Sequence, residues 1–540
     1  MIRPDRPARI VLALLFVVCS AAASSSIPHV TMTISAPEQL DANNDGMLTF
    51  TVSNPADLRA EEIFTDIALN RAGTAVSVTA APGWSCVHAA YGSPGTLHCT
   101  TPGIEAHAST TIAITARYSQ HYLLETVLVN LGQAPNGLFE SVAQDVAFAK
   151  PFQVTSTADS GPGSLREVVS EINAECTRFD VFTPCSITFN LPPPVPAQGW
   201  YTIEPLSPLP VFTADHVTID GETQTAATGD TNPLGPEVFL LGDRAGVCDG
   251  VGTPGFLEVR GLAIGGFAQN GVMLALGSIE RDYIGTDPTG SHAVPNGLHG
   301  ISTSPSTRGA ITITGNVISG NGRNGINFDT FTDPFTIANN RIGLAAKSDD
   351  RVPNGSSGIQ ITNMGGLYRG GQIEGNVIKF NGGFGIGIDR NSTGVRILEN
   401  IVAHNHNQAI DIGMDGASSF SLSPPVIESA TFDPASGQTV VTGKGALTGV
   451  VSGYDYSATL YFYANSAPVS EGERFIGSVA TDSTGRFVHR VNGDLRGLWI
   501  TGTTDQVIDF HDFVARNASE FSAPHQATAT GPARRRIVKR

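Results

Sequence analysis

Short apolar pairs that follow polar corners recur along the middle of the chain. The clearest copies are Gly315–Ile318, Gly375–Ile378 and Glu399–Val402, each with an asparagine directly before the apolar pair. Weaker copies place the equivalent position at residues 262, 282 and 340, which gives spacings of 20, 34, 24, 36 and 24 residues. Such a period, built from β-branched residues and Asn/Gly corners, predicts a solenoid of parallel strands.

Stacking these repeats gives two columns of residues that should point into the solenoid. They lie ten and twelve residues after each repeat position, once the insertions of the longer repeats are removed. Both columns are almost wholly apolar, as inward columns of a strand must be. The first contains Val272, Ile301, Ile326, Ile359, Ile386 and Ile410, and the second contains Leu274, Thr303, Phe328, Ile361, Ile388 and Ile412.

The residues beside these columns should form the outer face of the same sheet, which we therefore expect to be polar and to carry carboxylates. Between the columns lie Met273, Ser302, Asn327, Gln360, Gly387 and Asp411, and after them come Ala275, Ser304, Asp329, Thr362, Asp389 and Gly413. A corner column precedes them, in which the small residue after each member suggests a turn that points the side chain outward. Its members are His299, Asn324, Ser357, Phe384 and Gln408.

Three carboxylates of this face are the candidate catalytic residues, Asp329, Asp389 and Asp411. At roughly 4.8 Å per strand, Asp329 and Asp389 lie about 9.6 Å apart, near the upper limit for the two carboxylates of an inverting glycoside hydrolase. The same group could instead hold Ca²⁺, which prefers several oxygen ligands. A passive surface is the other alternative, because any soluble solenoid needs polar residues outside.

The candidate ligand-binding residues of the same face are His299, Asn327, Gln360, Phe384 and Arg390. Arg390 and Arg396 could supply the base or positive charge that a polysaccharide lyase needs, or simply balance nearby carboxylates. The repeated asparagines Asn316, Asn340, Asn376 and Asn400 indicate a structural role instead. Stacked side-chain amides can hydrogen-bond along a ladder, and asparagine tolerates a left-handed backbone.

Alternating patterns on both sides of the solenoid predict two β-sandwiches, over residues 27–150 and 424–530. Short alternating strands such as Met47–Val52 and Ala458–Ala464 are separated by turn residues, as in known sandwiches. Before them, residues 1–23 have the arginines, apolar run and small residues of a secretory signal peptide. Residues 531–540 form a basic tail, which we expect to be disordered.

The motif D-S-G-P-G-S-L-R-E at Asp159–Glu167 leads into a short amphipathic helix, Leu165–Ala174. It resembles the N-terminal cap of secreted bacterial right-handed parallel β-helix proteins. The likeness continues through Gly285–Gly297 and Gly315–Gly322. The resemblance implies that residues 151–415 form a right-handed, pectate-lyase-like solenoid, whose first coil needs a cap because its apolar edge would otherwise be exposed.

Two further motifs concern the flanking segments. Pro82–Thr100 carries a G-W-x-C…C signature that resembles the Ig-like repeat domain of bacterial surface proteins. Asn517–Ser522 reads N-x-S-E-F-S and resembles the β-sandwich that commonly follows these solenoids. The expected fold class is therefore all-β, with a right-handed parallel β-helix flanked by two β-sandwich domains.

The cysteines and the charge narrow the location and the partners. Export permits disulfides, and the close pairs Cys86–Cys99 and Cys176–Cys185 are the natural bridges, which leaves Cys248 free. The net charge of −17 argues against nucleic acid and modestly against a polyanionic ligand. No apolar run after the signal peptide is long enough to span a bilayer. We expect a secreted or cell-surface bacterial monomer.

Function is less constrained than fold. The R-x-P-x-x-R and W-I-D-H patterns of pectate lyases are absent, as are the N-T-D and G-H-G patterns of polygalacturonases, which share this fold. A fold alone carries no activity. The leading hypothesis is binding of an extended extracellular ligand, above all a polysaccharide. The alternatives are a polysaccharide lyase or glycoside hydrolase acting on the β-helix face, and an adhesin or structural spacer.

Overall fold

The protein folds into two compact units, Met1–Phe148 and Ala149–Arg540. Its structure, a computed structural model, describes residues 30–35, 45–69, 73–88, 96–118, 122–133, 137–149, 152–176, 185–214, 216–303, 309–329, 334–362, 370–390, 392, 394–413, 422–451, 454–509 and 514–529. The expected signal peptide and basic tail lie outside the described residues. No helix among the described residues is long and apolar enough to cross a membrane.

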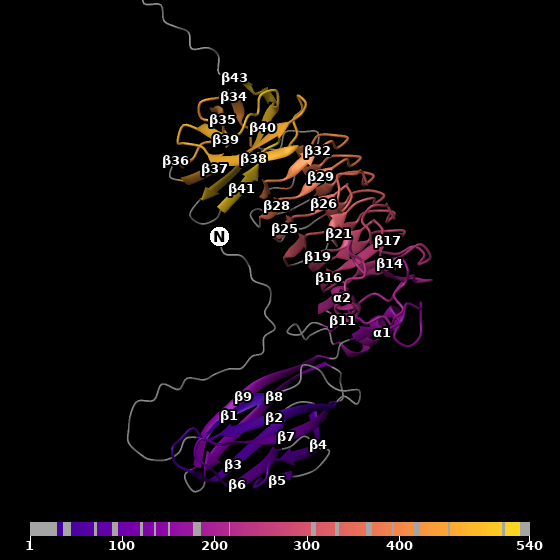
Figure 1. The fold of residues 1–540 in the computed structure, drawn as a ribbon, viewed down its shortest axis with the longest axis vertical. Helices are drawn as coiled ribbons and strands as arrows, with labels where there is room; N and C mark the ends of the chain where they lie inside the picture. The colour runs from indigo at the N-terminus through magenta and orange to yellow at the C-terminus, as the bar shows by residue number, and fades with distance from the viewer. Residues whose placement is uncertain are drawn as a thin grey trace, which may run out of the picture. The chain divides into compact units, whose positions relative to one another are not determined.

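The first unit is a sandwich of two antiparallel sheets (Figure 1). One sheet has the order β1 (Thr31–Ser35), β2 (Asp45–Ser53), β7 (Ser109–Tyr118), β4 (Gly73–Ala80). The other has the order β5 (Ser85–His88), β6 (Thr96–Ile104), β3 (Ala60–Leu69), β8 (Tyr122–Gln133), β9 (Gly137–Ala149). Alternate residues such as Leu48, Phe50 and Ile112 fill the core. The predicted Cys86–Cys99 disulfide joins β5 to β6.

Three parallel sheets form the solenoid that the repeats predicted, and their strands stack coil upon coil (Figure 1). The first sheet contains β10 (Phe152–Val154), β11 (Cys185–Phe189), β13 (His216–Asp220), β16 (Phe256–Arg260), β19 (Leu276–Glu280), β22 (Ile311–Thr314), β25 (Phe335–Ala338), β28 (Gly371–Glu374) and β31 (Val395–Leu398). The second contains β12 (Tyr201–Ile203), β14 (Val238–Leu241), β17 (Leu262–Gly265), β20 (Tyr283–Ile284), β23 (Val317–Ile318), β26 (Arg341–Ile342), β29 (Val377–Lys379) and β32 (Ile401–Ala403). The third contains β15 (Val251–Gly252), β18 (Val272–Leu274), β21 (Ile301–Thr303), β24 (Ile326–Asp329), β27 (Ile359–Thr362), β30 (Ile386–Asp389) and β33 (Ile410–Gly413).

Helix α1 (Leu165–Glu175) lies at the start of the solenoid, close to its predicted position. The Ser164 hydroxyl accepts a hydrogen bond from the Glu167 N–H, and the Glu167 carboxylate reaches back to the Gly163 N–H at 2.6 Å. This reciprocal arrangement satisfies donors that a helix start leaves unpaired. The apolar residues of α1 join the solenoid core, and the Cys176–Cys185 disulfide ties its end to β11. A second helix, α2 (Glu222–Thr228), follows β13.

The C-terminal sandwich packs against the last coil. One sheet has the order β39 (Arg486–Asn492), β35 (Gln438–Lys444), β34 (Val426–Asp433), β43 (Thr528–Ala529). The other contains β36 (Gly449–Val451), β37 (Tyr454–Asn465), β38 (Arg474–Ala480), β40 (Trp499–Asp509), β41 (Val514–Ala518) and β42 (His525–Gln526). Tyr463 and Phe521 belong to the same buried cluster as the solenoid core. The sandwich therefore covers apolar surface that the last coil would otherwise expose.

The repeated asparagines form a buried ladder at the turn into the second sheet, as the sequence predicted. Asn316 donates from Nδ2 to Asn340 Oδ1 at 3.0 Å, and the same bond links Asn340 to Asn376 and Asn376 to Asn400. The residue before each repeat position has a positive φ, including the non-glycine residues Arg281 and Glu399. This left-handed residue turns the chain at each corner. The side-chain amide of the asparagine that follows then makes the hydrogen bonds that strand pairing cannot make at a turn.

A second ladder, which the sequence did not reveal, lies at the end of the second sheet. Its members are all buried, and each but the last donates from Nδ2 to the Oδ1 of the following member; they are Asn296, Asn321, Asn354, Asn381 and Asn405. Four of the five are followed by glycine, and a Cβ on any of these glycines, Gly297, Gly322, Gly355 and Gly382, would approach within 2.5 Å of a backbone oxygen of the preceding coil. The Asn-Gly pairs were the available signal.

Candidate functional site

The outer face of the third sheet has the register that the sequence predicted. Val272 pairs with Ile301, Ile301 with Ile326, and the pairing continues without a shift to Ile386 and Ile410. The intervening outward residues therefore line up in the expected order, from Met273 to Asp411. Both inward columns are buried apart from Ile412, which is half-buried against the same core.

The three candidate carboxylates differ in their surroundings. Asp329 is exposed, and its Oδ1 accepts from the Thr362 hydroxyl at 3.2 Å. Asp389 is half-buried and accepts from the Ser392 hydroxyl at 2.5 Å. Thr362 pairs with Asp329, and Asp389 follows in the next strand, so the two carboxylates lie two strands and about 10 Å apart. Asp411 is only 9% exposed, so little of its carboxylate can meet a ligand.

Asp411 lies where the C-terminal sandwich meets the last coil. The Ile412 N–H, at the open edge of the third sheet, donates to Glu520 Oε1 at 3.1 Å. Burial raises the pKa of Glu520, and the nearby negative charge of Asp411 raises it further. Glu520 belongs to the N-x-S-E-F-S motif, whose carboxylate thus takes the place of the missing next strand.

The corner column forms a third ladder, in which each side chain accepts a backbone N–H from the next coil. The acceptors are Asp249, Asn270, His299, Asn324 and Ser357, at 2.9 to 3.3 Å, and the last donor is the Phe384 N–H. The expected outward turn is therefore wrong for Asn324 and Ser357, which are buried. His299 and Phe384 are half-buried, and Gln408 is exposed.

His299 has a defined protonation state in this ladder. Its Nδ1 accepts from the Asn324 N–H at 3.2 Å, so the neutral ring carries its proton on Nε2. Burial, helped by the positive charge of Arg323, lowers the pKa of His299 to about 4. At neutral pH the residue is an uncharged donor at the edge of the face.

Two partly exposed amides form the centre of the face. Asn327 Oδ1 accepts from Asn324 Nδ2 at 3.1 Å, and Gln360 Oε1 accepts from the Ser357 hydroxyl at 3.1 Å. Asn327 Nδ2 donates to the Ser302 hydroxyl and Gln360 Nε2 to the Gly387 carbonyl, both at 3.4 Å. The buried corner column thus fixes both amide oxygens, and both side chains are partly exposed.

The two candidate arginines lie in different places. Arg390 follows β30 and is exposed. Arg396 is on the first sheet, where its Nε donates to Asp505 Oδ1 of the sandwich at 3.0 Å and its Nη2 donates to Oδ2. Asp505 is almost fully buried, so Arg396 serves as its counter-charge. The structure therefore does not bring Arg396 to the candidate face.

A group of three potential metal ligands lies away from this face. His404, Glu471 and Glu473 meet where the second sheet contacts the sandwich, beside the pairing of Val402 with Gly472. His404 Nδ1 is 3.7 Å from Glu471, whereas Nε2 is 3.8 Å from Glu473. Because the imidazole contacts each carboxylate through a different nitrogen, the geometry fits an ion-pair bridge.

Calcium binding by Asp329, Asp389 and Asp411 stays a prediction.

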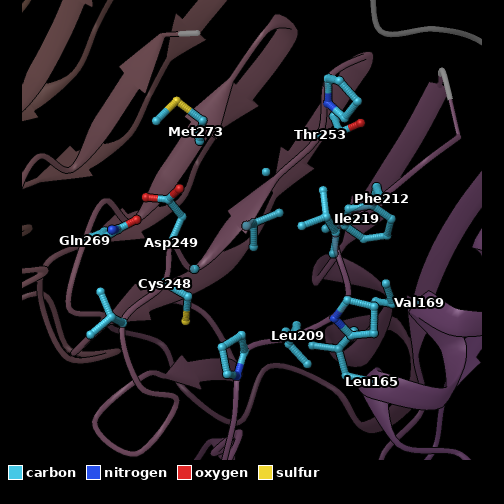
Figure 2. A pocket seen from close by; sticks show the side chains of 18 residues that line it. Leu165, Val169, Leu209, Phe212, Ile219, Cys248, Asp249, Thr253, Gln269 and Met273 are labelled. Atoms are coloured by element: carbon cyan, nitrogen blue, oxygen red, sulfur yellow. The ribbon is translucent and has the colours of Figure 1, made fainter.

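A cavity of about 520 Å³ opens beside β15, the first strand of the third sheet (Figure 2). Leu165, Val169, Leu209 and Phe212 line its apolar side, whereas Asp249 and Gln269 lie on the other. Cys248 also lines it, is half-buried and forms no disulfide. Burial raises the pKa of the Cys248 thiol, as does the Asp249 carboxylate, so the sulfur is a poor nucleophile at neutral pH.

Comparisons with known proteins support the central fold. Residues 250–423 match the family model described as a right handed beta helix region. No curated protein matches the chain. Similar solved structures include the collagen-binding domain of a Staphylococcus aureus adhesin, at 10% identity over 23% of this chain and 99% of that chain, with a TM-score of 0.16. They also include an immunoglobulin-like protein from Nocardia farcinica, at 14% identity over 22% of this chain and 98% of that chain, with a TM-score of 0.16.

A further similar structure is the enzymatically active domain of tailspike protein 4 from bacteriophage CBA120, at 9% identity over 73% of both chains, with a TM-score of 0.18. TM-scores this low carry no argument about the present chain. The family match over residues 250–423 and the three parallel sheets together show that the central part of the chain folds as a right-handed parallel β-helix.

Proposed function

We propose that this protein binds an extended extracellular polysaccharide along the outer face of the third sheet. The observation that carries the proposal is the pair of anchored amides, Asn327 and Gln360, on adjacent strands roughly 4.8 Å apart. Each has its amide oxygen held by the corner column, and each side chain is partly exposed on the outer face. Preorganised polar groups that repeat along a rod fit a ligand that is itself a repeating chain of hydroxyls.

The surface beside these amides supports the same proposal. Gly387 continues their column, and a Cβ there would lie 2.9 Å from Gln360 and 3.2 Å from the Phe384 ring. Gly387 is buried, and its missing side chain lets the half-buried Phe384 ring pack close beside Gln360, where the ring can meet the apolar face of a sugar. The net charge of −17 and the nearby Asp329 and Asp389 favour a neutral polysaccharide over a polyanionic one.

An extracellular location is part of the proposal. The predicted signal peptide directs export, and the Cys86–Cys99 and Cys176–Cys185 disulfides are typical of oxidising compartments. A polysaccharide outside the cell would reach the solenoid directly.

Hydrolysis is the second candidate, because Asp329 and Asp389 lie on one face at a separation close to that of inverting enzymes. Incubation of the protein with neutral glycans, followed by assays for reducing and unsaturated ends, tests this candidate. Product that disappears in Asp329→Asn or Asp389→Asn would establish the enzyme. Product that survives both variants would exclude these carboxylates.

Affinity electrophoresis through gels containing neutral polysaccharides tests the binding proposal. We expect the double variant Asn327→Ala/Gln360→Ala to bind about tenfold more weakly, since two hydrogen bonds of about 0.5–1.5 kcal/mol each are lost. The matched control is Thr312→Ala/Thr336→Ala, which removes partly exposed outward residues from adjacent strands of the first sheet. Equal retention of both double variants at unchanged melting temperatures would refute the proposal.

A further inference from the structure

The first unit has a groove of its own on the outer face of its five-stranded sheet. The cavity measures about 510 Å³ and is formed by β3, β5, β6 and the turn before β5. Most of the residues that line it are polar or small: Glu62, Ile63, Phe64, Gly83, Ser85, His98, Thr100, Thr101 and Pro102. Its volume lies within the usual range of small-ligand sites, roughly 300–1,000 Å³.

Strand pairing arranges the outward side chains of this sheet in two rows. Ser85 pairs with Thr100, Thr100 with Phe64, and Phe64 with Gly132 of β8. In the neighbouring row on the same face, Val87 pairs with His98, and His98 pairs with Asp66. Neighbours in a row lie about 5 Å apart, so one row places two hydroxyls beside an aromatic ring, and the other places a histidine beside a carboxylate.

Phe64 supplies the apolar surface of the groove. Its ring is half-buried, and its neighbour Gly132 has no side chain with which to cover it. The Phe64 ring centroid lies 6.2 Å from that of His98, with 30° between the ring planes. The exposed part of the ring is therefore bordered by a hydrogen-bonding imidazole on one side and by the Thr100 hydroxyl on another.

The histidine is held in a fixed orientation. His98 Nδ1 lies 2.6 Å from Asp66 Oδ1, which leaves Nε2 as the nitrogen that a ligand can reach. The exposed hydroxyls of Ser85 and Thr100 can both donate and accept. A ligand that presents an apolar ring face together with several hydroxyls would satisfy both halves of this groove.

The backbone next to the groove is unusual. Glu62 has φ of +52°, a left-handed conformation that is uncommon for a residue other than glycine. Pairing of β3 with β6 skips this residue, opposite which Pro102 has no N–H to donate. Such local strain concentrates at functional sites. Here it occurs in a residue whose carboxylate borders the groove, next to Phe64 and Asp66.

We propose that this groove is a binding site for one pyranose ring of a neutral glycan, with the ring face on Phe64 and its hydroxyls on His98, Ser85 and Thr100. The carboxylates of Glu62 and Asp66 disfavour uronate, sulfate and phosphate groups at the same place. The proposal is independent of the third-sheet face, since every residue that carries it belongs to the first unit.

Saturation-transfer NMR and calorimetric titration of the full chain with neutral methyl glycosides test the proposal. Phe64→Leu keeps an apolar side chain but removes the aromatic face, and we expect it to weaken binding about tenfold or more. Phe64→Trp keeps an aromatic face and should bind as well as the native chain. Asp66→Ala, which removes the oxygen that orients His98, should weaken binding by a smaller factor. Val87→Ser, on the same face outside the lining residues, is the control and should change nothing.

Each outcome decides one of the two sites. Loss of methyl glycoside binding in Phe64→Leu, with polymer retention lost only in Asn327→Ala/Gln360→Ala, supports both sites separately. Methyl glycoside binding that survives Phe64→Leu at an unchanged melting temperature would overturn the groove and leave the third-sheet face standing. Absence of binding to every neutral glycoside, or binding to charged ones alone, would also overturn it.

Discussion

Two regions of the solenoid use the same residue types for opposite purposes. In the turn ladders, Asn340 and Asn376 are almost fully buried, and their Nδ2 groups each donate two hydrogen bonds, to an amide oxygen and to a backbone carbonyl. On the outer face of the third sheet, Asn327 and Gln360 have their amide oxygens held by buried neighbours, and their side chains are partly exposed. An amide side chain therefore stabilises this fold where it is buried and is available to a ligand where it is not.

The comparison also shows how the two regions depend on each other. The corner column connects the two regions. Asn324 and Ser357 are buried and accept backbone N–H groups, as ladder residues do, and their side chains also donate hydrogen bonds to Asn327 and Gln360 on the outer face. The open amides are oriented by buried ones. A change in a ladder should therefore appear in stability, whereas a change in the open amides should appear in binding.

The largest expected effect is the loss of a ladder rung. Asn376→Ala removes the acceptor of the buried Asn340 N–H and the donor to the Ile337 carbonyl, both at 2.8 to 2.9 Å. Leaving such groups unpaired costs roughly 1–3 kcal/mol each, so we expect the free energy of unfolding to fall by about 3 kcal/mol. Urea denaturation followed by circular dichroism measures it, and Asn327→Ala, which removes the acceptor of Asn324 Nδ2, should lower it by about 1 kcal/mol. Equal losses in the two variants would erase the distinction between the regions.

The next effect comes from Asp282, which occupies a ladder position where later coils have asparagine. Its Oδ1 accepts from the Leu262 N–H, but among the described residues its Oδ2 has no hydrogen-bond partner, and burial raises the pKa of Asp282 well above the ordinary value. Burial therefore favours the neutral form of this carboxyl in the folded chain. Asp282→Asn should stabilise the protein by about 1–2 kcal/mol at neutral pH, because an amide NH₂ completes the ladder.

The pH dependence of that gain provides the check. A raised folded pKa means that the stability contribution of the acid is intact below about pH 3.8, the ordinary value, and is lost as the pH rises toward the folded pKa. The advantage of Asp282→Asn over the native chain should thus grow from acid to neutral pH. An advantage that stays constant over this range would show that Asp282 is not a buried neutral acid.

The smallest expected effect concerns His299, a member of the corner column that connects the two regions. The folded pKa of His299, about 4, lies below the ordinary value of 6.5. Its neutral form therefore adds stability above about pH 6.5, and this contribution is lost as the pH falls toward 4. His299→Asn keeps an acceptor for the Asn324 N–H without a titrating group, as Asn270 does one coil earlier. Melting temperatures of the variant should decline less than those of the native chain between pH 6.5 and 4.

The sequence predicted the solenoid and its register because the apolar residues of the inward columns recur at fixed, short distances from each repeat position. It also predicted the role of Asn316 and its equivalents. It did not predict the burial of Asp411, because the covering residue Glu520 comes from a sandwich more than a hundred residues later. Arg396 lies on β31 of the first sheet, a local position in the repeat, whereas its pairing with Asp505 depends on the same distant sandwich. The groove around Phe64 depends on the pairing of β3 with β6, which no local pattern specifies.

The second ladder has a consequence for the chemical lifetime of the protein. Asparagine followed by glycine is the sequence most prone to deamidation, in which the glycine nitrogen attacks the side-chain carbonyl. In the four Asn-Gly pairs of this ladder, that nitrogen donates instead to a carbonyl of the preceding coil, at 2.7 to 2.9 Å; the glycines are Gly297, Gly322, Gly355 and Gly382. The stacking that closes each coil thus also blocks the reaction that would turn a rung into a carboxylate. Asp282, in the first ladder, shows what deamidation of such an asparagine would produce. It is a buried acid with no NH₂ group to donate to the next residue of the ladder.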